Sequence, residues 1–282
     1  MPASAQRRKP TRRRGPAAIV WVVAGIALAL LVLPLVAVLI RTPWATLPQL
    51  LGRTEVAQAL WLSISTGVIS TALCLVLGTP LAIVLARAES WPAVPRRLLR
   101  AAVTVPLVLP PVVGGIALLL LLGRNGVLGS YLAPLGISLP FTTPAVVIAQ
   151  TFVAMPFLVF AVEGALRAAD RRVEQAAATL GATPFQVFRL VTVPIVAPGI
   201  AAGAVLCFAR ALGEFGATIT FAGSFPGVTR TLPIASYLAL ESNPDEAIAL
   251  ALLLMAVAST MLTVPVVGPK LKRMGEIVFR VK

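Results

Sequence analysis

The feature that most constrains this chain is a series of six apolar segments, each long enough to cross a lipid bilayer as a helix. The hydrocarbon core of a bilayer needs about 20 helical residues. The segments are continuously apolar rather than alternating, and this pattern favours helices over the strands of a membrane barrel. The predicted spans are residues 17–40, 57–86, 101–122, 144–162, 195–222 and 247–269. We therefore expect an all-α membrane protein with six transmembrane helices.

The first predicted span follows a basic stretch and has to be distinguished from a cleaved secretory signal. Six Lys and Arg lie within residues 1–16. The apolar part of a signal is usually about 7 to 15 residues long, which is shorter than residues 17–40. We expect a retained span, with basic cytoplasmic tails at 1–16 and 270–282 and a transmembrane domain at 17–269.

The distribution of Lys and Arg predicts the orientation, because positively charged connections resist translocation. If the N-terminus is cytoplasmic, nineteen Lys and Arg lie on the inner side and four on the outer side. Both termini are therefore expected in the cytoplasm. The formal net charge of +14 would suggest a nucleic-acid partner in a soluble protein. Here the whole excess falls on the inner side, so we expect membrane lipid as the nearest partner and no nucleic acid.

The residue inventory excludes several kinds of active site. The chain has no His, which excludes a His-ligated metal and a Ser-His-Asp triad. Cys74 and Cys207 lie in apolar stretches and are expected to be small buried side chains. None of the four lysines follows a glycine, so the sequence contains no P-loop. We expect no catalytic residue, no metal and no cofactor in this chain, and any energy from ATP has to come from a separate subunit.

Proline and glycine recur inside the predicted spans. The third span contains Pro106, Pro110, Pro111, Gly114 and Gly115. Proline removes a backbone donor and clashes with the preceding turn, so we expect this helix to kink or break. A bundle that lines a translocation path and rocks is one interpretation, and the ordinary abundance of Pro and Gly in membrane helices is the other.

The spacing of Gly199 and Gly203 in the fifth span lets another helix approach closely. We expect this close approach within one subunit rather than at a dimer face.

The inner connection at 163–194 is predicted to form two short helices. Residues 171–180 read as a helix that Gly181 closes in a left-handed conformation. Thr183 offers an N-cap, Pro184 suits the first helical position, and Gln186 completes the spacing of a capping box. Two short helices with an exposed turn make a rigid projection into the cytoplasm, and such a projection is expected to dock a partner.

This connection resembles the hallmark loop of the membrane-spanning permease subunits of bacterial ABC importers. The family pattern reads E-A-A-x-x-x-G, nine residues, then I-x-L-P. The matching positions are Gln175, Ala176, Ala177, Gly181, Val191, Val193 and Pro194. Gln175 replaces the usual Glu, with Glu174 beside it, and Val replaces both Ile and Leu. The resemblance extends from the first span to the last, and it implies the ABC importer permease fold in the bacterial inner membrane.

The resemblance also implies the partners of the chain. In the family this loop forms a coupling helix that sits in a cleft of the ATP-binding subunit. The assembly would contain two copies of this chain, two ATP-binding subunits that hold ATP and Mg²⁺, and an extracytoplasmic oxyanion-binding protein. The implied docking residues are Glu174, Gln175, Ala176, Ala177, Gly181, Ala182 and Pro184.

Three segments narrow the substrate class by resemblance. Residues 209–221, residues 226–233 and Arg124-Asn125-Gly126 are similar to the molybdate permeases. Sulfate and tungstate permeases share much of the core at 212–216. The endings T-I-T-F and T-R-T-L-P favour molybdate, with sulfate or tungstate as the alternative.

Arg210 and Glu214 are the only charged residues inside a predicted span. Each ionisable group at membrane depth costs about 2.5 to 3.5 kcal/mol, so the two are expected to face the bundle interior and to pair. Their i, i+4 spacing places them on one helical face. They form either an ion pair that fixes packing or a site where Arg210 adds positive potential along an oxyanion path.

Three further polar residues have two interpretations each. Thr218 and Thr220 either donate hydrogen bonds to a passing oxyanion or bond the carbonyls of their own helix. Arg230, in the outer connection, either contacts the binding protein or is a solvated arginine beside the turn at Pro226-Gly227.

Two other classes of protein compete with the permease hypothesis. An ion-coupled secondary transporter needs intramembrane carboxylates that bind the ion, and Glu214 is the only candidate. A membrane-embedded hydrolase needs a nucleophile with a base or a metal, and the absence of His disfavours it.

Overall fold

The computed structural model describes residues 18–260, and every regular element in that range is a helix. The prediction of an all-α protein is therefore confirmed for the described residues. The chain divides into two compact units, Met1–Thr42 and Pro43–Lys282.

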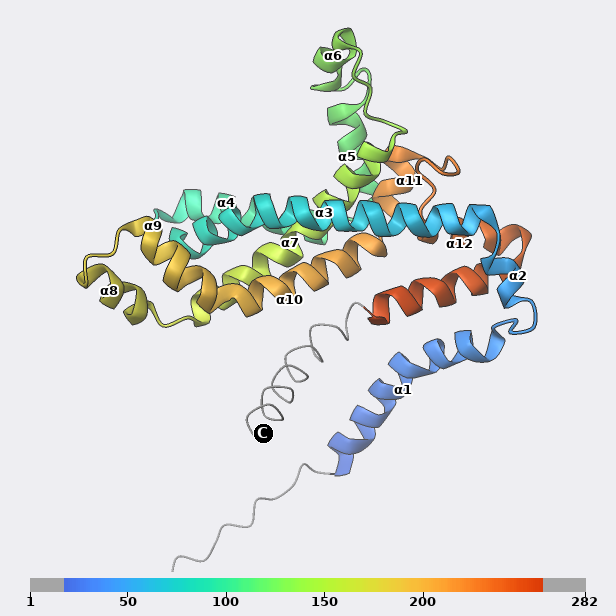
Figure 1. Cartoon of the computed structure of the whole chain (residues 1–282), viewed down its shortest axis with the longest axis horizontal. Coiled ribbons are helices and arrows are strands. Elements are labelled where there is room, and N and C mark those ends of the chain that lie inside the picture. Colours follow the sequence, from blue (N-terminus) through green and yellow to red (C-terminus); the bar gives the residue numbers. More distant parts are fainter. Residues whose placement is uncertain (1–17, 261–282) are drawn as a thin grey trace, which may run out of the picture. The chain divides into compact units, whose positions relative to one another are not determined.

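The described part of the first unit is one long helix. Helix α1 runs from Ala18 to Arg41 and includes Pro34. It coincides closely with the first predicted span at 17–40. Its apolar side chains are exposed throughout, as expected for a helix that lipid surrounds. Figure 1 shows it as the dark-blue helix at the start of the described chain.

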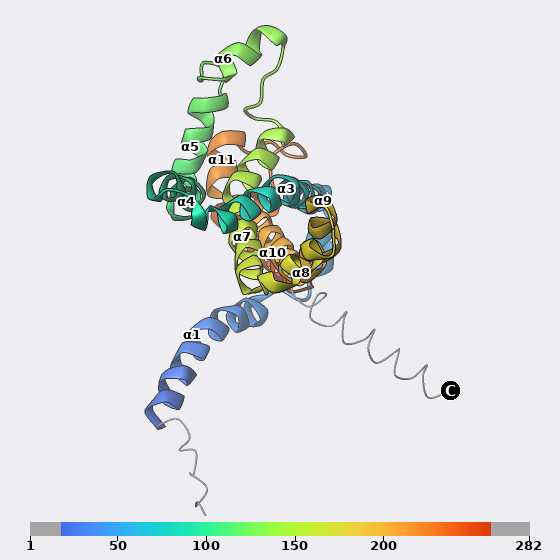
Figure 2. The same ribbon diagram turned by 90° about the vertical axis from the view of Figure 1, so that its left-hand side faces the viewer.

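Three long helices form the centre of the second unit. Helix α3 (Thr54–Arg87) follows the short helix α2 (Leu47–Leu51) and packs against α7 (Thr143–Ala168) and α10 (Val193–Leu212). The views in Figures 1 and 2 agree on this side-by-side arrangement. The shared core contains both cysteines, which are buried and unoxidised, as well as Leu158 and Ala211.

Small residues bring α10 close to α7. A Cβ atom built on Gly199 would lie 2.3 Å from the Cβ of Ala165, and one on Gly203 would lie 3.0 Å from the Cβ of Ala161. The predicted close approach at this glycine spacing is confirmed, and it occurs within the subunit.

The third predicted span, 101–122, is not one continuous helix. The chain forms α4 (Ala93–Val108) and α5 (Pro111–Leu122), which meet at an angle of 116°. Leu109 takes an extended conformation ahead of Pro110, and two successive prolines cannot donate to the preceding turn. The expected kink or break is confirmed as a full break at Leu109, which lies beyond Pro106 and directly before the Pro110-Pro111 pair.

The fifth predicted span, 195–222, is also divided, at a position that the sequence analysis did not indicate, whereas α10 continues through Pro198. Helix α10 ends at Leu212, and a second helix, α11, runs from Gly216 to Ala222. The two breaks lie together, because a Cβ atom on Gly216 would be 2.9 Å from the Cβ of Pro111. Beyond them α5 and α11 pack side by side, with a buried cluster that includes Leu118, Val146 and Phe221.

The remaining described helices surround this core. The connection from α5 to α7 contains α6 (Gly129–Leu132) and the 3₁₀ turn η2 (Ala133–Leu135). Helix α12 (Leu232–Ser242) packs on α3. Residues 244–260 are helical and overlap the sixth predicted span, whose last part, 261–269, lies outside the described residues.

By length and composition, four of the described helices can cross a membrane, or five if the bent pair α4–α5 is counted as one span.

Candidate functional site

The loop between α7 and α10 folds locally as predicted. A 3₁₀ turn, η1 (Ala88–Ser90), follows α3 nearby, and the loop itself contains α8 (Arg171–Thr179) and α9 (Pro184–Val187). Asp170 caps α8 by accepting a hydrogen bond from the backbone N of Arg172 at 2.9 Å. Gly181 has φ = +87°, and Thr183 and Gln186 form the reciprocal capping box. The predicted local conformation of this projection is therefore confirmed.

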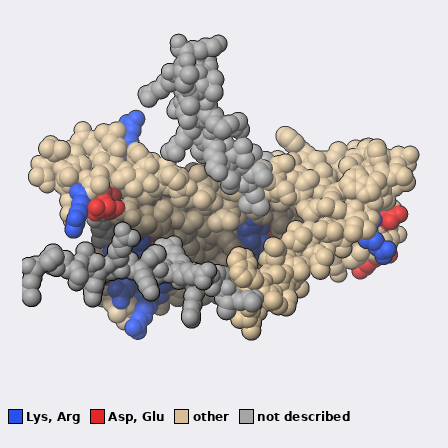
Figure 3. Space-filling model, turned by 90° about the horizontal axis from the view of Figure 1, so that it is seen from below, with Lys and Arg blue, Asp and Glu red and all other residues tan. Residues whose placement is uncertain are grey.

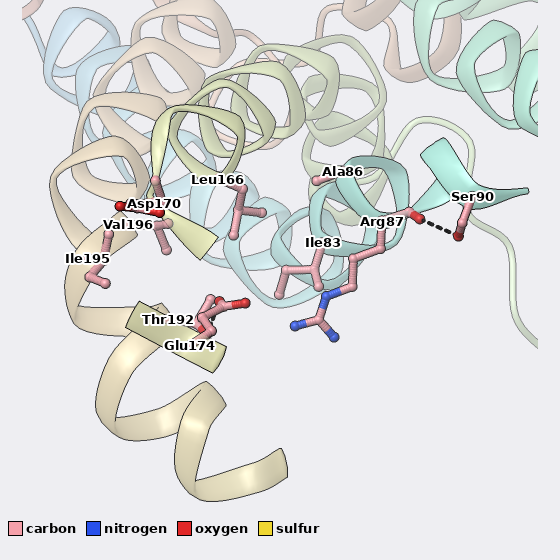
Figure 4. A pocket seen from close by; sticks show the side chains of 11 residues that line it. Ile83, Ala86, Arg87, Ser90, Leu166, Asp170, Glu174, Thr192, Ile195 and Val196 are labelled. Carbon is pink, nitrogen blue, oxygen red and sulfur yellow. Dashed lines mark hydrogen bonds between the residues drawn. The ribbon is translucent and has the colours of Figure 1, made fainter. Parts of the chain in front are cut away.

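The loop joins the membrane helix through a π-helical turn, η3 (Phe188–Thr192), which the sequence analysis missed. Thr192 is only 3% exposed, and its hydroxyl donates to Oε1 of Glu174 at 2.5 Å. The carboxylate of Glu174, expected to face a docking partner, is therefore held toward the start of α10. Figure 4 shows Glu174 and Thr192 together on one wall of a cavity.

Other predicted docking residues lie at the surface of the loop. Gln175, Ala176, Gly181 and Pro184 are exposed, whereas Ala177 and Ala182 are half-buried. Two large apolar side chains that the family pattern does not specify stand beside them, Leu180 at 88% exposure and Phe185 at 68%. Exposed apolar side chains on a rigid projection are typical of a protein-binding surface.

The hydrogen bond between Thr192 and Glu174 should hold α8 against the membrane helix. We expect Thr192→Val to weaken the attachment by about 1 kcal/mol, since a net hydrogen bond contributes about that much. Amide hydrogen exchange in residues 171–179 should become about fivefold faster. Thr179→Val is the matched control, because its hydroxyl bonds Gln175 O within α8. Equal effects of both variants would contradict a special role for Thr192.

A network of ion pairs ties η1, the middle of α4 and the end of α7 together. Glu163 is 3% exposed and accepts from Arg100 Nη2 at 2.5 Å and from Arg167 Nε at 2.9 Å. Arg167 also pairs with Glu89. Helix α7 continues past the predicted end of the fourth span at 162 to Ala168, and the i, i+4 pair from Glu163 to Arg167 supports the extra turn.

Arg210 and Glu214 form the predicted ion pair where α10 ends. Arg210 Nη2 lies 2.6 Å from Glu214 Oε2, with Glu214 1% exposed and Arg210 25% exposed. The contact is close but lacks the alignment of a hydrogen bond. The other oxygen of Glu214 accepts from the backbone N of Ala217 at 2.7 Å. Glu214 therefore links the end of α10 to the first turn of α11.

The two threonines behave differently from each other. Thr220 donates to Gly216 O at 2.8 Å, which is the bond to its own helix. Thr218 is completely buried, and its hydroxyl has no hydrogen-bond partner among the described residues. Thr220 therefore bonds a carbonyl of its own helix, which is the second of the two interpretations given for it. The hydroxyl of Thr218 remains free to donate a hydrogen bond to another group.

Arg230 is held in place rather than freely solvated. Its Nε donates to Ser224 Oγ at 3.0 Å, and its Nη2 donates to Ser224 O at 3.4 Å. It lines a small cavity together with Glu55 and Glu246, and Glu246 pairs with Arg53 at 2.5 Å. This cluster lies at the end of the unit opposite α8 and α9 (Figure 1).

A comparison of the sequence with known protein families identifies the family to which these long, broken helices and the projecting loop belong. The profile of a family described as "Binding-protein-dependent transport system inner membrane component" matches residues 78–267. The chain belongs to this family. It is thus a multi-pass inner-membrane permease, and the resemblance seen in the loop is confirmed.

Curated relatives of this permease include molybdenum and sulfate transport system permease proteins. It is 52% identical to the molybdenum transport system permease protein ModB of Mycobacterium tuberculosis, over 84% of this chain and 88% of the relative. Identity to the Escherichia coli protein of the same name is 43%, over 60% and 74%. A sulfate transport system permease protein CysW of Synechocystis is 37% identical, over 76% and 78%.

Solved structures share the fold of the permease. A bacterial alginate ABC transporter in complex with a periplasmic protein matches with a TM-score of 0.68 at 18% identity, covering 88% of this chain and 91% of the other. The MetNI methionine ABC transporter in an inward-facing conformation matches with a TM-score of 0.59 at 19% identity, covering 74% and 92%.

Proposed function

We propose that this permease forms the transmembrane path of an ATP-driven importer for molybdate. The observation that carries the proposal is the 52% identity to a molybdenum permease along 88% of its length. The sulfate permease is less similar, at 37%. The T-I-T-F segment lies in α11, whose first turn bonds Glu214, and the T-R-T-L-P segment runs into the first turn of α12.

The proposed topology has six spans with both termini in the cytoplasm. The described helices supply α1, α3, the bent pair, α7, α10 with α11, and residues 244–260. Figure 3 supports the orientation, since basic side chains predominate at the end that carries α8 and α9, whereas acidic and basic side chains occur together at the other end. Connections rich in Lys and Arg are retained in the cytoplasm.

In the proposed assembly two copies of the permease enclose the path. An ATP-binding subunit docks on each projecting loop, and a binding protein delivers the oxyanion on the opposite side. ATP binding would draw the two loops together and open the path outward, and release after hydrolysis would return it inward. Arg210, Glu214, Thr218 and Thr220 are the proposed path residues, and Arg230 is the proposed contact for the binding protein.

Uptake by the reconstituted complex tests the substrate. We expect molybdate uptake that stops without ATP, and unlabelled molybdate should compete at concentrations well below those of sulfate. Equal competition by sulfate would favour a sulfate permease. Uptake that persists on a proton gradient without ATP would favour an ion-coupled secondary transporter instead.

The exposed apolar side chains of the loop provide a test of docking. We expect the double variant Leu180→Ser, Phe185→Ser to weaken association with the ATP-binding subunit at least about tenfold, because buried apolar anchors dominate such interfaces. The matched control is Leu135→Ser, which removes a side chain that is 72% exposed in the connection between α5 and α7. Co-purification that survives the double variant, or that the control weakens equally, would contradict docking on this loop.

A further inference from the structure

A cavity separates the projecting loop from the membrane helices. Its volume is about 340 Å³, within the range of about 300 to 1,000 Å³ that is usual for small-molecule sites. It is bounded by the last turns of α3 and α7, by α8, and by the start of α10. Figure 4 shows the cavity from close by, with the acidic residues on one side and Arg87 on the other.

The cavity carries opposite charges on facing walls. Asp170 and Glu174 line one wall, and Arg87 lines the other with its guanidinium directed into the space. Among the described residues Arg87 makes no ion pair and no side-chain hydrogen bond. Each acid has one oxygen engaged, Asp170 by the N of Arg172 and Glu174 by Thr192, so one oxygen of each remains available.

The remainder of the cavity is apolar, and exposed apolar side chains lie beside it. Ile83, Leu166, Ile195 and Val196 complete the lining. Ile195 is itself 41% exposed, and Val84 and Leu190 nearby are 41% and 68% exposed. Arg87 is the last residue of a helix apolar enough to span a membrane. The cavity therefore lies where hydrocarbon gives way to water.

We propose that this cavity binds the headgroup of a zwitterionic aminophospholipid. The phosphate would accept hydrogen bonds from Arg87, whose planar group donates two parallel bonds to a phosphate. The ammonium would donate to the free oxygens of Asp170 and Glu174, and the glycerol and first methylenes would lie along Ile83, Ile195 and Val196. The bound lipid would fill the space between the loop and the membrane helices.

The two carboxylates make the proposal selective. The hydroxyls of a phosphatidylglycerol headgroup can donate hydrogen bonds to the acidic wall, but they carry no positive charge, and the two acids repel the net negative charge of that lipid. A choline headgroup carries its positive charge on a methylated nitrogen that donates no hydrogen bond. We therefore expect retention in the order ethanolamine, then choline, then glycerol headgroups.

Native mass spectrometry of the purified protein tests the order. The protein is delipidated and then exchanged into micelles that contain equal amounts of phosphatidylethanolamine, phosphatidylcholine and phosphatidylglycerol. We expect one phosphatidylethanolamine retained per chain, bound at least about tenfold more tightly than the other two lipids, which is the difference that one charge-assisted hydrogen bond implies. Equal retention of all three lipids, or preference for phosphatidylglycerol, overturns the proposal.

Two variants remove one charge from each wall while keeping the fold. Asp170→Asn retains the helix cap, because Asn caps as well as Asp, and Arg87→Gln removes the partner of the phosphate. Asp170→Asn should abolish the preference for phosphatidylethanolamine, whereas Arg87→Gln should weaken the retention of all three lipids, because each of them carries the phosphate. The control is Arg97→Gln, an exposed arginine at the same end of the unit that lines a neighbouring cavity instead. A preference that survives Asp170→Asn, lipid retention that Arg87→Gln leaves unchanged, or a control with the same effect as either variant overturns the proposal.

A separate experiment distinguishes the lipid from a soluble ligand that carries the same phosphate and ammonium groups. O-phosphoethanolamine at millimolar concentration is added to the delipidated protein, and the midpoint of thermal unfolding is measured. The lipid should raise the midpoint and the soluble compound should not, because it lacks the apolar part that lies along Ile195. Equal stabilisation by both would assign the cavity to a soluble phosphoamine and overturn the lipid proposal.

Discussion

Arg210→Gln should lower the free energy of unfolding by about 3 kcal/mol, the lower end of the range for breaking a buried ion pair. The carboxylate of Glu214 is 1% exposed and would lose its counter-charge, while Arg210 itself is partly exposed, which moderates the effect. Unfolding of the purified protein in mixed micelles of increasing SDS content measures the change.

The double variant Arg210→Gln, Glu214→Gln separates structure from transport. Glutamine at 214 keeps an oxygen for the backbone N of Ala217, so most of the lost stability should return. If the pair serves packing alone, molybdate uptake should return with it. Uptake that stays low in a stable double variant, yet is kept by Arg210→Lys, would place the positive charge of residue 210 on the oxyanion path. A double variant no more stable than the single one would contradict the ion-pair account.

Gly115→Ala should disrupt the contact between α5 and α11. The new Cβ atom would lie 2.8 Å from Ala217 O and 2.9 Å from Ala217 Cα, and backbone atoms cannot move aside as a flexible side chain can. Overpacking of this kind costs about 1 to 3 kcal/mol. We expect a lower midpoint of thermal unfolding and reduced uptake, because the two helix breaks would no longer fit together.

Gly164→Ala is the matched control for this prediction. It makes the same chemical change inside α7, where a Cβ atom would meet nothing within 4 Å. Alanine is favoured over glycine in a helix by up to about 1 kcal/mol, so the control should be neutral or stabilising. If Gly115→Ala were as stable as Gly164→Ala, the α5–α11 contact would not be as tight as described.

Local conformation at caps and turns could be predicted from the sequence more accurately than the positions at which long helices break. The capping box at Thr183 and the left-handed Gly181 follow from the residues at those positions, and both were predicted correctly. The break at Leu109 was expected from the prolines, but the break at 213–215 was not. No proline marks it, and the close approach of Gly216 to Pro111, which depends on the tertiary structure, accompanies it.

The same distinction holds for the candidate site. The pairing of Arg210 with Glu214 follows from four-residue spacing on one helix, and it was predicted. The bond from Thr192 to Glu174 joins residues 18 apart, and the cavity beside it includes Arg87, which comes from a different helix. Contacts of this kind require the fold to be known, and the periodicity of one segment does not contain them.

The π-helical turn at Phe188–Thr192 has a consequence for how such proteins diversify. A π turn holds one residue more than an α turn, and each residue of an α-helix turns the chain by about 100°. The extra residue therefore sets the direction of the loop independently of the faces that α10 turns toward its neighbours. Over evolutionary time, a lineage that gained or lost one residue here could re-aim its loop at a changed partner while the membrane helix kept its existing contacts.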